Sequence, residues 1–347
     1  MNNNLENLIY DLSNSSSHSL YTVDENKSTI DEIKSNSSSQ SSYLELVTFK
    51  LRGRAEWWEL KHSDIYINET IGFGGTGVIN KAKWRGLECV VKCLKHNNND
   101  TEYNDLINEI SIISHLRHPN LVLFLGACTI TDPLLLIYEY MINGSLDTYY
   151  NLMSKKKKGV WIPKNNIINR WLLELAQAIC FLHHCYYPIM HRDIKPSNIL
   201  LSENLHIKIS DFGLSKTIKK KHGKYKMSGC TGTLRYMAPE VILYNNDIKY
   251  DLKIDIYSLS LNYWFICTGF IPFKELDYNK NFAYIITNGY RPDINMIKYN
   301  IPKLKNLIRN MWDNNPTNRP DIDNVLKIIE TLNIYDIKTT NKYCNII

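Results

Sequence analysis

Residues 191–213 read HRDIKPSNILLSENLHIKISDFG, and this stretch decides the fold and the chemistry of the chain. It places Asp193, Lys195 and Asn198 in one short loop, and Asp211 opens the DFG triplet 18 residues after Asp193. Phosphoryl transfer requires a carboxylate that takes a hydroxyl proton, side chains that hold Mg²⁺, and a cation beside the migrating phosphate. The stretch contains all of these groups in the order of a known motif set. The two motifs at this spacing therefore indicate phosphoryl-transfer chemistry.

A glycine-rich segment lies upstream, at residues 71–79, IGFGGTGVI. The G-x-G-x-x-G array that it contains also occurs in dinucleotide-binding folds, where it opens a helix. Here the glycines are followed by the alternating, strand-like residues VINKAKWRG, and then by ECVVK, which ends at Lys92. The pattern therefore favours a hairpin that folds over phosphates, with a lysine 15 residues after Gly77.

A carboxylate partner for Lys92 is expected, because a buried ammonium that faces phosphates needs an opposite charge to hold it. Residues 103–117 carry Leu106, Ile110 and Ile113 at helical spacing, and Glu109 lies in this predicted helix, 17 residues after Lys92. On its own Glu109 would be interpreted as part of a solvated helix face. With the other motifs, a Lys92–Glu109 pair is predicted.

Together these motifs resemble the signature set of the eukaryotic protein kinases. Three downstream segments match the same family in the correct order: GTLRYMAPE at 232–240, IDIYSLS at 254–260 and NPTNRP at 315–320. The resemblance implies that Asp255 anchors the backbone of the catalytic loop and that Arg319 pairs with Glu240.

The resemblance also implies an α+β fold with the two lobes of a protein kinase, over about residues 65–335. The small lobe, about 65–140, would be an antiparallel β-sheet with helix C, and the large lobe, about 141–335, would be mainly helical. Residues 1–55 are rich in Asn and Ser and poor in apolar residues, which predicts a disordered N-terminal tail. Residues 336–347 would form a C-terminal tail.

The resemblance assigns the catalytic roles residue by residue. Asp193 would orient the substrate hydroxyl and accept its proton, and Lys195 would neutralise the γ-phosphate. Lys92, oriented by Glu109, would hold the α- and β-phosphates.

ATP and Mg²⁺ are the cofactors that the family implies, with the metal held by Asn198 and Asp211. Tyr138 occupies the gatekeeper position, which would narrow the pocket behind the adenine. The residues expected to contact the nucleotide are Ile71, Gly72, Gly74, Gly75, Gly77, Ile79, Val90, Lys92, Tyr138, Glu139, Met141 and Leu200. The stack that marks the active state of the family would comprise Ile113, Phe124, His191 and Phe212.

The subgroup follows from LRHPNLVLFLGACT at 116–129 and YEYMINGSL at 138–146, which resemble the tyrosine-kinase-like, Raf-like and mixed-lineage enzymes. Lys195, two residues after the catalytic aspartate, is typical of serine/threonine kinases, and so is Thr233, which would contact Asp193 and Lys195. Protein substrates with serine or threonine hydroxyls are therefore expected, with occasional tyrosine left open. The rival interpretation is a pseudokinase that acts as a scaffold or allosteric binding module. Pseudokinases usually lose the lysine, the catalytic aspartate or the metal aspartate, and this chain has all three.

The composition sets further bounds. A net charge of +6, from 41 basic and 35 acidic residues, does not indicate a nucleic-acid partner. The eight cysteines form no C-x-x-C pair and indicate no zinc or disulfide framework. With no apolar N-terminal segment, the protein is expected in the cytoplasm. A solvated loop is predicted for the four lysines at 155–158, and docking on the small lobe for Trp57 and Trp58.

Two segments allow a membrane interpretation. Residues 256–273 carry no charge, but their polar residues, Gly269 and Pro272 favour a helix buried in the large lobe. The last four residues, from Cys344, fit a loose prenylation pattern, the alternative being a frayed terminus. A membrane partner is expected only if Cys344 is lipidated.

The basic segment between Asp211 and Glu240 predicts a switch. A phosphate on Ser228 or Thr231 would pair with Arg192 and nearby lysines and order the segment. This phosphate could be added in trans by a second copy of the chain, which predicts self-association.

Overall fold

The computed structural model describes residues 53–54, 56–74, 77–94, 100–130, 132–218, 233–243, 251–276 and 281–332. Residues from Trp58 onward form one compact unit, and the elements below belong to it. Most of the expected tail at 1–55 lies outside the described residues, as do the C-terminal tail, Gly75, Ser228, Thr231 and Cys344.

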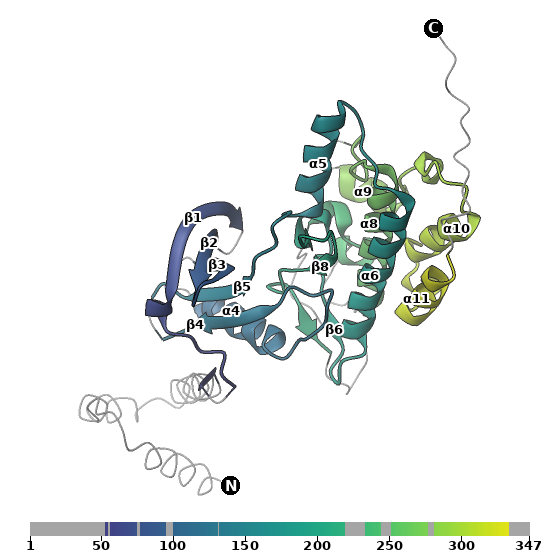
Figure 1. Ribbon diagram of the computed structural model, residues 1–347. Coiled ribbons are helices and arrows are strands. Elements are labelled where there is room, and N and C mark those ends of the chain that lie inside the picture. Colours follow the sequence, from purple (N-terminus) through teal and green to yellow (C-terminus); the bar gives the residue numbers. More distant parts are fainter. Residues whose placement is uncertain are drawn as a thin grey trace, which may run out of the picture. The chain divides into compact units, whose positions relative to one another are not determined.

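The small lobe is a five-stranded antiparallel sheet in the order β1-β2-β3-β5-β4 (Figure 1). Alternation along β3 decides which side chains enter the core, since Cys89 and Val91 are fully buried there. Val90 and Lys92 therefore lie on the opposite face. The strands are β1 (Ile65–Gly74), β2 (Gly77–Trp84), β3 (Leu87–Leu94), β4 (Phe124–Cys128) and β5 (Leu135–Glu139), and the helix of this lobe is α4 (Asp100–Ile113).

Residues 58–60 add a short parallel segment to the β4 edge of this sheet. Leu60 N–H donates to Ala127 O (2.7 Å), and Ala127 N–H donates to Trp58 O (2.8 Å). A Cβ at Gly126 would lie 2.6 Å from Leu60 Cγ, so glycine makes room for this segment. Trp58 is buried, as expected, whereas Trp57 is 88% exposed, so the docking prediction was wrong for Trp57.

The large lobe is mainly helical, as expected. Its helices are α5 (Leu146–Lys157), α6 (Asn165–His183), α7 (Pro239–Ile242), α8 (Lys253–Thr268), α9 (Asn281–Thr287), α10 (Pro302–Met311) and α11 (Ile322–Glu330). Two short antiparallel pairs complete it: β6 (Ile189–Met190) with β9 (Lys216–Thr217), and β7 (Ile199–Leu201) with β8 (Ile207–Ile209). Short 3-10 helices cover His62–Asp64, Pro196–Asn198, Leu234–Tyr236, Ile294–Met296 and Pro316–Asn318.

Helix α8 explains the long uncharged run. Every residue from Ile254 to Thr268 is buried, so the helix has no solvent-facing side that would require charge. It ends at Gly269, whose φ of 73° is left-handed and whose missing Cβ avoids Trp161 O. Within the described part of the chain, no helix combines the length and the apolar character needed to cross a membrane.

The lysine tract forms a helix end, not the predicted loop. Lys155, Lys156 and Lys157 make up the last turn of α5, and Lys158 closes it with a left-handed φ of 55°. All four side chains are exposed, so the expected solvation is confirmed. Cations are favourable at a helix C-terminus, where unpaired carbonyl groups carry partial negative charge, and this allows the helix to continue.

Candidate active site

The backbone of the catalytic loop, at His191 and Arg192, is held by the buried carboxylate of Asp255 at the start of α8. Asp255 Oδ1 accepts a hydrogen bond from the backbone N–H of Arg192 (2.9 Å), and Oδ2 accepts one from the backbone N–H of His191 (2.9 Å) and lies 3.1 Å from His183 Nε2. Burial alone would raise the pKa of Asp255, but the hydrogen bond and charge of His183, together with the backbone donor of Arg192, lower it. The ionised group holds Arg192 at a left-handed φ of 69°. The predicted anchor is confirmed.

The carboxylate of Asp193 is surrounded by hydrogen-bond donors from three directions. Lys195 Nζ lies 2.6 Å from Oδ2, and Asn198 Nδ2 donates to the same oxygen at 2.9 Å. Thr233 donates to Oδ1 through its hydroxyl and its backbone N–H, both at 3.2 Å. Lys195 also donates to Thr233 Oγ1 at 2.7 Å. The predicted contact of Thr233 with both residues is confirmed.

A chain of charges joins the two lobes at Lys92. Its Nζ lies 3.3 Å from both carboxylate oxygens of Glu109 on α4, and 3.3 Å from Oδ1 of Asp211. Burial lowers the pKa of Lys92, but the two carboxylates outweigh it, and the net shift is upward. Burial raises the pKa of Asp211, whereas Lys92, His191 and Lys195 lower it, and the net shift is downward. Lys92 is therefore protonated and Asp211 ionised at neutral pH.

The gatekeeper side chain joins this network, which the sequence did not reveal. Tyr138, at the end of β5, donates its hydroxyl to Glu109 Oε1 at 3.0 Å. Burial and the nearby Glu109 charge raise the pKa of Tyr138 well above its ordinary value, so the hydroxyl keeps its proton. Glu109 is thus held by two donors, one from β3 and one from β5.

The four side chains expected to stack are all buried, with exposed fractions of 4% or less: Ile113, Phe124, His191 and Phe212. The rings of His191 and Phe212 meet edge to face at 5.0 Å, and His191 Nε2 contacts Ser210 O at 3.1 Å. Phe124 meets the ring of Tyr138 edge to face at 5.8 Å. The His191–Phe212 contact of the expected stack is therefore present, and Phe124 contacts the gatekeeper Tyr138, which bonds to Glu109.

The glycine-rich hairpin has two kinds of glycine. A Cβ at Gly77 would lie 2.2 Å from the backbone oxygen of Cys93, so the close approach of β2 to β3 excludes any side chain there. A Cβ at Gly72 would find its nearest neighbour, Ile79, at 3.9 Å, an ordinary contact. Gly77 thus has a packing role within the sheet, in addition to the expected one beside phosphates.

The other expected nucleotide contacts come from both lobes. Ile79 pairs with Lys92, and Val90 pairs with Tyr138, across neighbouring strands. Ile71 is about half exposed, Leu200 is partly buried and Met141 is buried.

The segment between the lobes is held by a contact that sequence reasoning missed. The carboxylate of Glu139 accepts from Lys208 Nζ (2.5 Å) and from the backbone N–H of Leu123 (2.7 Å). Glu139 N–H donates in turn to Leu123 O at 3.0 Å. These bonds tie the end of β5 to the approach to β4 and to β8 of the large lobe.

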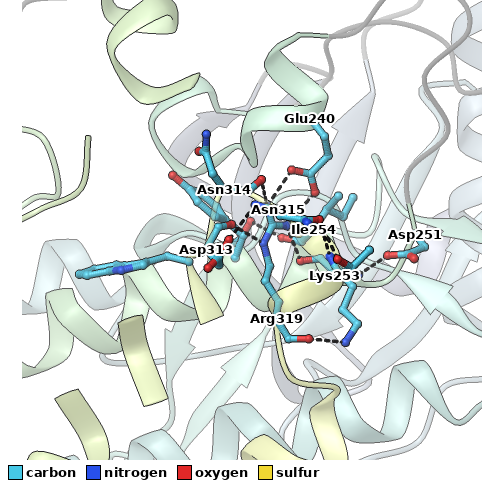
Figure 2. Close-up of polar contacts among 12 residues, drawn as sticks. Glu240, Asp251, Lys253, Ile254, Asp313, Asn314, Asn315 and Arg319 are labelled. Carbon is cyan, nitrogen blue, oxygen red and sulfur yellow. Dashed lines mark hydrogen bonds and ion pairs between the residues drawn. The ribbon is translucent and has the colours of Figure 1, made fainter. Parts of the chain in front are cut away.

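The predicted Glu240–Arg319 pair is confirmed and is bidentate (Figure 2). Arg319 Nη1 and Nη2 donate to the two carboxylate oxygens of Glu240 at 2.7 and 2.8 Å, and the arginine side chain is fully buried. Its Nε donates to Asp313 O (2.9 Å), and Lys253 Nζ donates to Arg319 O (2.5 Å). The pair joins the segment after Thr233 to the start of α8.

Comparison with known proteins agrees with this geometry. The chain is 36% identical over 283 residues to the serine/threonine-protein kinase VIK of Arabidopsis thaliana, covering 79% of this chain and 62% of that protein. It is 33% identical over 275 residues to the probable serine/threonine-protein kinase drkB of Dictyostelium discoideum, covering 79% of this chain and 38% of that one. The chain thus spans less than two thirds of the length of these relatives. Residues 65–328 match the protein kinase domain family, so the chain belongs to the protein kinases.

Proposed function

We propose that this protein is an ATP-dependent protein kinase that transfers the γ-phosphate of ATP to serine and threonine hydroxyls of other proteins. The observation that carries the proposal is the environment of Asp193. Its carboxylate lies between a lysine, an amide and a threonine hydroxyl, so it is a pre-oriented acceptor for the proton of a substrate hydroxyl. Lys195, which contacts both Asp193 and Thr233, is placed to neutralise the phosphate that moves there.

The residues present fit the nucleotide and the metal that the family uses. The Asp211 side chain is 47% exposed and ionised. The amide nitrogen of Asn198 donates to Asp193, so its amide oxygen remains as a possible metal ligand. Mg²⁺ prefers oxygen ligands and supplies charge neutralisation at the phosphates. We assign the metal to Asp211 and Asn198, and the α- and β-phosphates to Lys92.

The likeness of residues 116–129 and 138–146 to the tyrosine-kinase-like group places the protein, in our proposal, among the Raf-like and mixed-lineage serine/threonine enzymes. The choice of hydroxyl is supported by two relatives, one named a serine/threonine-protein kinase and the other a probable serine/threonine-protein kinase. Six cysteines of the described residues are free thiols, as a reducing compartment maintains, which supports a cytoplasmic site of action.

The test is phosphate transfer from labelled ATP with Mg²⁺ to a generic basic protein, followed by phosphoamino-acid analysis. Wild type should label serine and threonine, and Asp193→Asn should not. Lys92→Met should also be inactive yet folded, because Glu109 keeps the Tyr138 donor and burial already raises the pKa of Glu109, so it can take up a proton. Nucleotide binding with no transfer by wild type would favour the pseudokinase alternative. Substantial transfer by folded Lys92→Met would remove Lys92 from its role.

A phosphate-dependent switch forms part of the proposal, although Ser228 and Thr231 lie outside the described residues. Arg192 donates through Nε to Leu214 O, and burial together with the charge of Arg192 lowers the pKa of Lys216. The positive charges of Arg192 and Lys216 therefore lie close together near the start of the basic segment between Asp211 and Glu240. A phosphate on this segment would offset their repulsion. We expect the Ser228→Ala/Thr231→Ala double variant and phosphatase-treated wild type to lose activity. Full activity in both would exclude the switch, and the dependence of autophosphorylation on protein concentration tests whether a second copy adds the phosphate.

A membrane contact is proposed only through a lipid on Cys344, which also lies outside the described residues. An intact-mass measurement on protein from its native cell tests it. An unmodified terminus would exclude the lipid.

A further inference from the structure

Three metal-ligating side chains meet where α6 packs against α11, outside the residues assigned to phosphoryl transfer. Cys180 and His184 are four residues apart at the end of α6, so they lie on the same face of that helix. Asp323 belongs to the first turn of α11. One ligand atom from each residue lies within 4.8 Å of the other two. The group therefore bridges two helices that are far apart in the sequence.

The contacts of His184 indicate which of its nitrogens could bind a cation beside Asp323. Its Nδ1 lies 2.9 Å from the backbone oxygen and 3.6 Å from Sγ of Cys180, and its Nε2 lies 3.2 Å from Oδ2 of Asp323. A neutral imidazole carries one N–H, so if Nδ1 donates to the carbonyl, Nε2 presents a lone pair to a carboxylate oxygen. Two acceptors at this distance need a cation or a proton between them. The backbone contact at Nδ1 is the arrangement that orients histidine ligands in metal sites.

The donor set favours a transition metal over Mg²⁺. Thiolate, imidazole and carboxylate are the ligands of tetrahedral zinc sites, whereas Mg²⁺ takes oxygen ligands. Ordinary zinc–ligand bond lengths place neighbouring donors about 3.3–3.6 Å apart in a tetrahedron. Here Nε2 and Oδ2 are 3.2 Å apart, and Cys180 Sγ is 3.8 Å from Oδ1 of Asp323. These two contacts use different oxygens of Asp323, and the Asp323 side chain is 61% exposed, so its carboxylate can rotate to turn one oxygen toward both Nε2 and Sγ while the Nδ1 contact of His184 is kept.

A cavity of about 440 Å³ borders the same group, and His184 and Asp323 form part of its wall. A metal held by three protein ligands keeps a fourth position for water or another ligand, and the cavity offers the space for it.

We propose that Cys180 Sγ, His184 Nε2 and a carboxylate oxygen of Asp323 form a zinc-type site that joins α6 to α11. Binding would replace the thiol proton of Cys180, which is released to solvent, and would leave the fourth position to water. The neighbouring residue on α6, His183, contacts the Asp255 carboxylate that anchors the catalytic loop. The metal would thus stabilise the end of the helix on which that anchor depends.

The experiment uses the full-length chain, freed of metal and without ATP, titrated with Co²⁺ and with Zn²⁺. Wild type should bind one Co²⁺ with a thiolate-to-metal charge-transfer band and tetrahedral visible bands, and Zn²⁺ should displace it and raise the Tm by several degrees. Cys180→Ser should lose the charge-transfer band and the Tm shift. His184→Gln and Asp323→Asn should weaken Co²⁺ binding at least tenfold.

Cys185→Ser is the matched control, since Cys185 lies just after the end of the same helix and its Sγ contacts Phe181 O instead of the group. It should behave as wild type. Equal charge-transfer bands in wild type and folded Cys180→Ser would place the metal on another cysteine and overturn the proposal. No band and no Tm shift in wild type would mean that a proton, and not a metal, separates His184 from Asp323. If Cys180→Ser does not fold, Co²⁺ binding to Asp323→Asn is the deciding measurement. Binding at least tenfold weaker than in wild type supports the site, and unchanged binding overturns it.

Discussion

At the residue scale, the position of Lys92 depends on how Glu109 is held. The glutamate is buried and receives one charged donor, Lys92, and one neutral donor, the Tyr138 hydroxyl. A carboxylate that accepts two donors has little freedom to rotate, so the lysine is fixed relative to Asp211. Tyr138 is therefore a positioning residue for the proposed phosphate contact.

Tyr138→Phe tests this role, because it removes the hydroxyl and keeps the ring that packs against Phe124. Loss of one hydrogen bond to a charged group costs about 1.5–3 kcal/mol. Part of that loss should appear as a decrease of kcat/KM of about tenfold. Steady-state kinetics measure it, with Tyr149→Phe on α5 as the control. Unchanged kinetics in Tyr138→Phe would show that Lys92 alone positions Glu109.

At the element scale, the β2–β3 pair illustrates how a strand can require glycine without a turn. The backbone oxygen of Cys93 occupies the place of a Cβ at Gly77, and a backbone atom cannot move aside as a flexible side chain would. The expected result of Gly77→Ala is a loss of about 1–3 kcal/mol in the free energy of unfolding, as for other overpacked sites.

Gly72→Ala, in the same hairpin, is the matched control, since its nearest neighbour would be 3.9 Å away. Thermal unfolding without nucleotide compares the two. If both variants have the same Tm as wild type, the packing role of Gly77 is refuted and only its expected contact with phosphates remains.

At the scale of the whole molecule, buried ion pairs connect segments that local structure cannot join. Arg319 and Glu240 are 79 residues apart, and the guanidinium is also bonded to backbone oxygens of Asp313 and Lys253 (Figure 2). Removing one partner leaves the other buried without its counter-charge, which costs far more than a surface pair is worth.

Arg319→Ala should therefore lower the free energy of unfolding by about 3–5 kcal/mol. Arg309→Ala on α10, where the arginine is exposed and donates to the side chain of Asn306, should change it by less than about 0.5 kcal/mol. Denaturant unfolding measures both. A loss in Arg319→Ala no greater than in Arg309→Ala would mean that neighbouring groups compensate for the pair.

The lowered pKa values of Asp211 and Asp255 predict how stability depends on pH. Since each carboxylate is more acidic when folded than the ordinary value of about 3.9, its stabilisation is present above that pH and is lost as the pH falls through the folded value. The Tm should be flat near neutral pH and fall below about pH 4. In Asp211→Asn the Tm should fall less steeply with decreasing pH than in wild type. Measuring the Tm of both proteins across that pH range tests this. An equally steep fall in the variant would exclude Asp211 from the acid transition.

The sequence by itself determined the family, the order of the motifs and the charged groups of the proposed site. Asp193, Lys195 and Asn198 lie within one loop, so their proximity follows from chain connectivity, and the structure brings them together as expected. The helix that carries Glu109 was predicted from apolar spacing over residues 103–117, and the structure has it at Asp100–Ile113. The lysine tract was misjudged because charge indicates solvation and not the absence of a helix.

Only the tertiary structure decided which distant side chains meet. Tyr138 and Glu109 are 29 residues apart, and Cys180 and Asp323 are 143 apart. Glycine is required at position 77 because the backbone oxygen of Cys93 on the neighbouring strand leaves no room for a Cβ. The ion pair of Glu139 is made with Lys208 on β8. Periodicity and motif spacing describe one segment at a time, whereas these contacts are set by how the segments pack, where close packing and the burial of charge select which side chains pair.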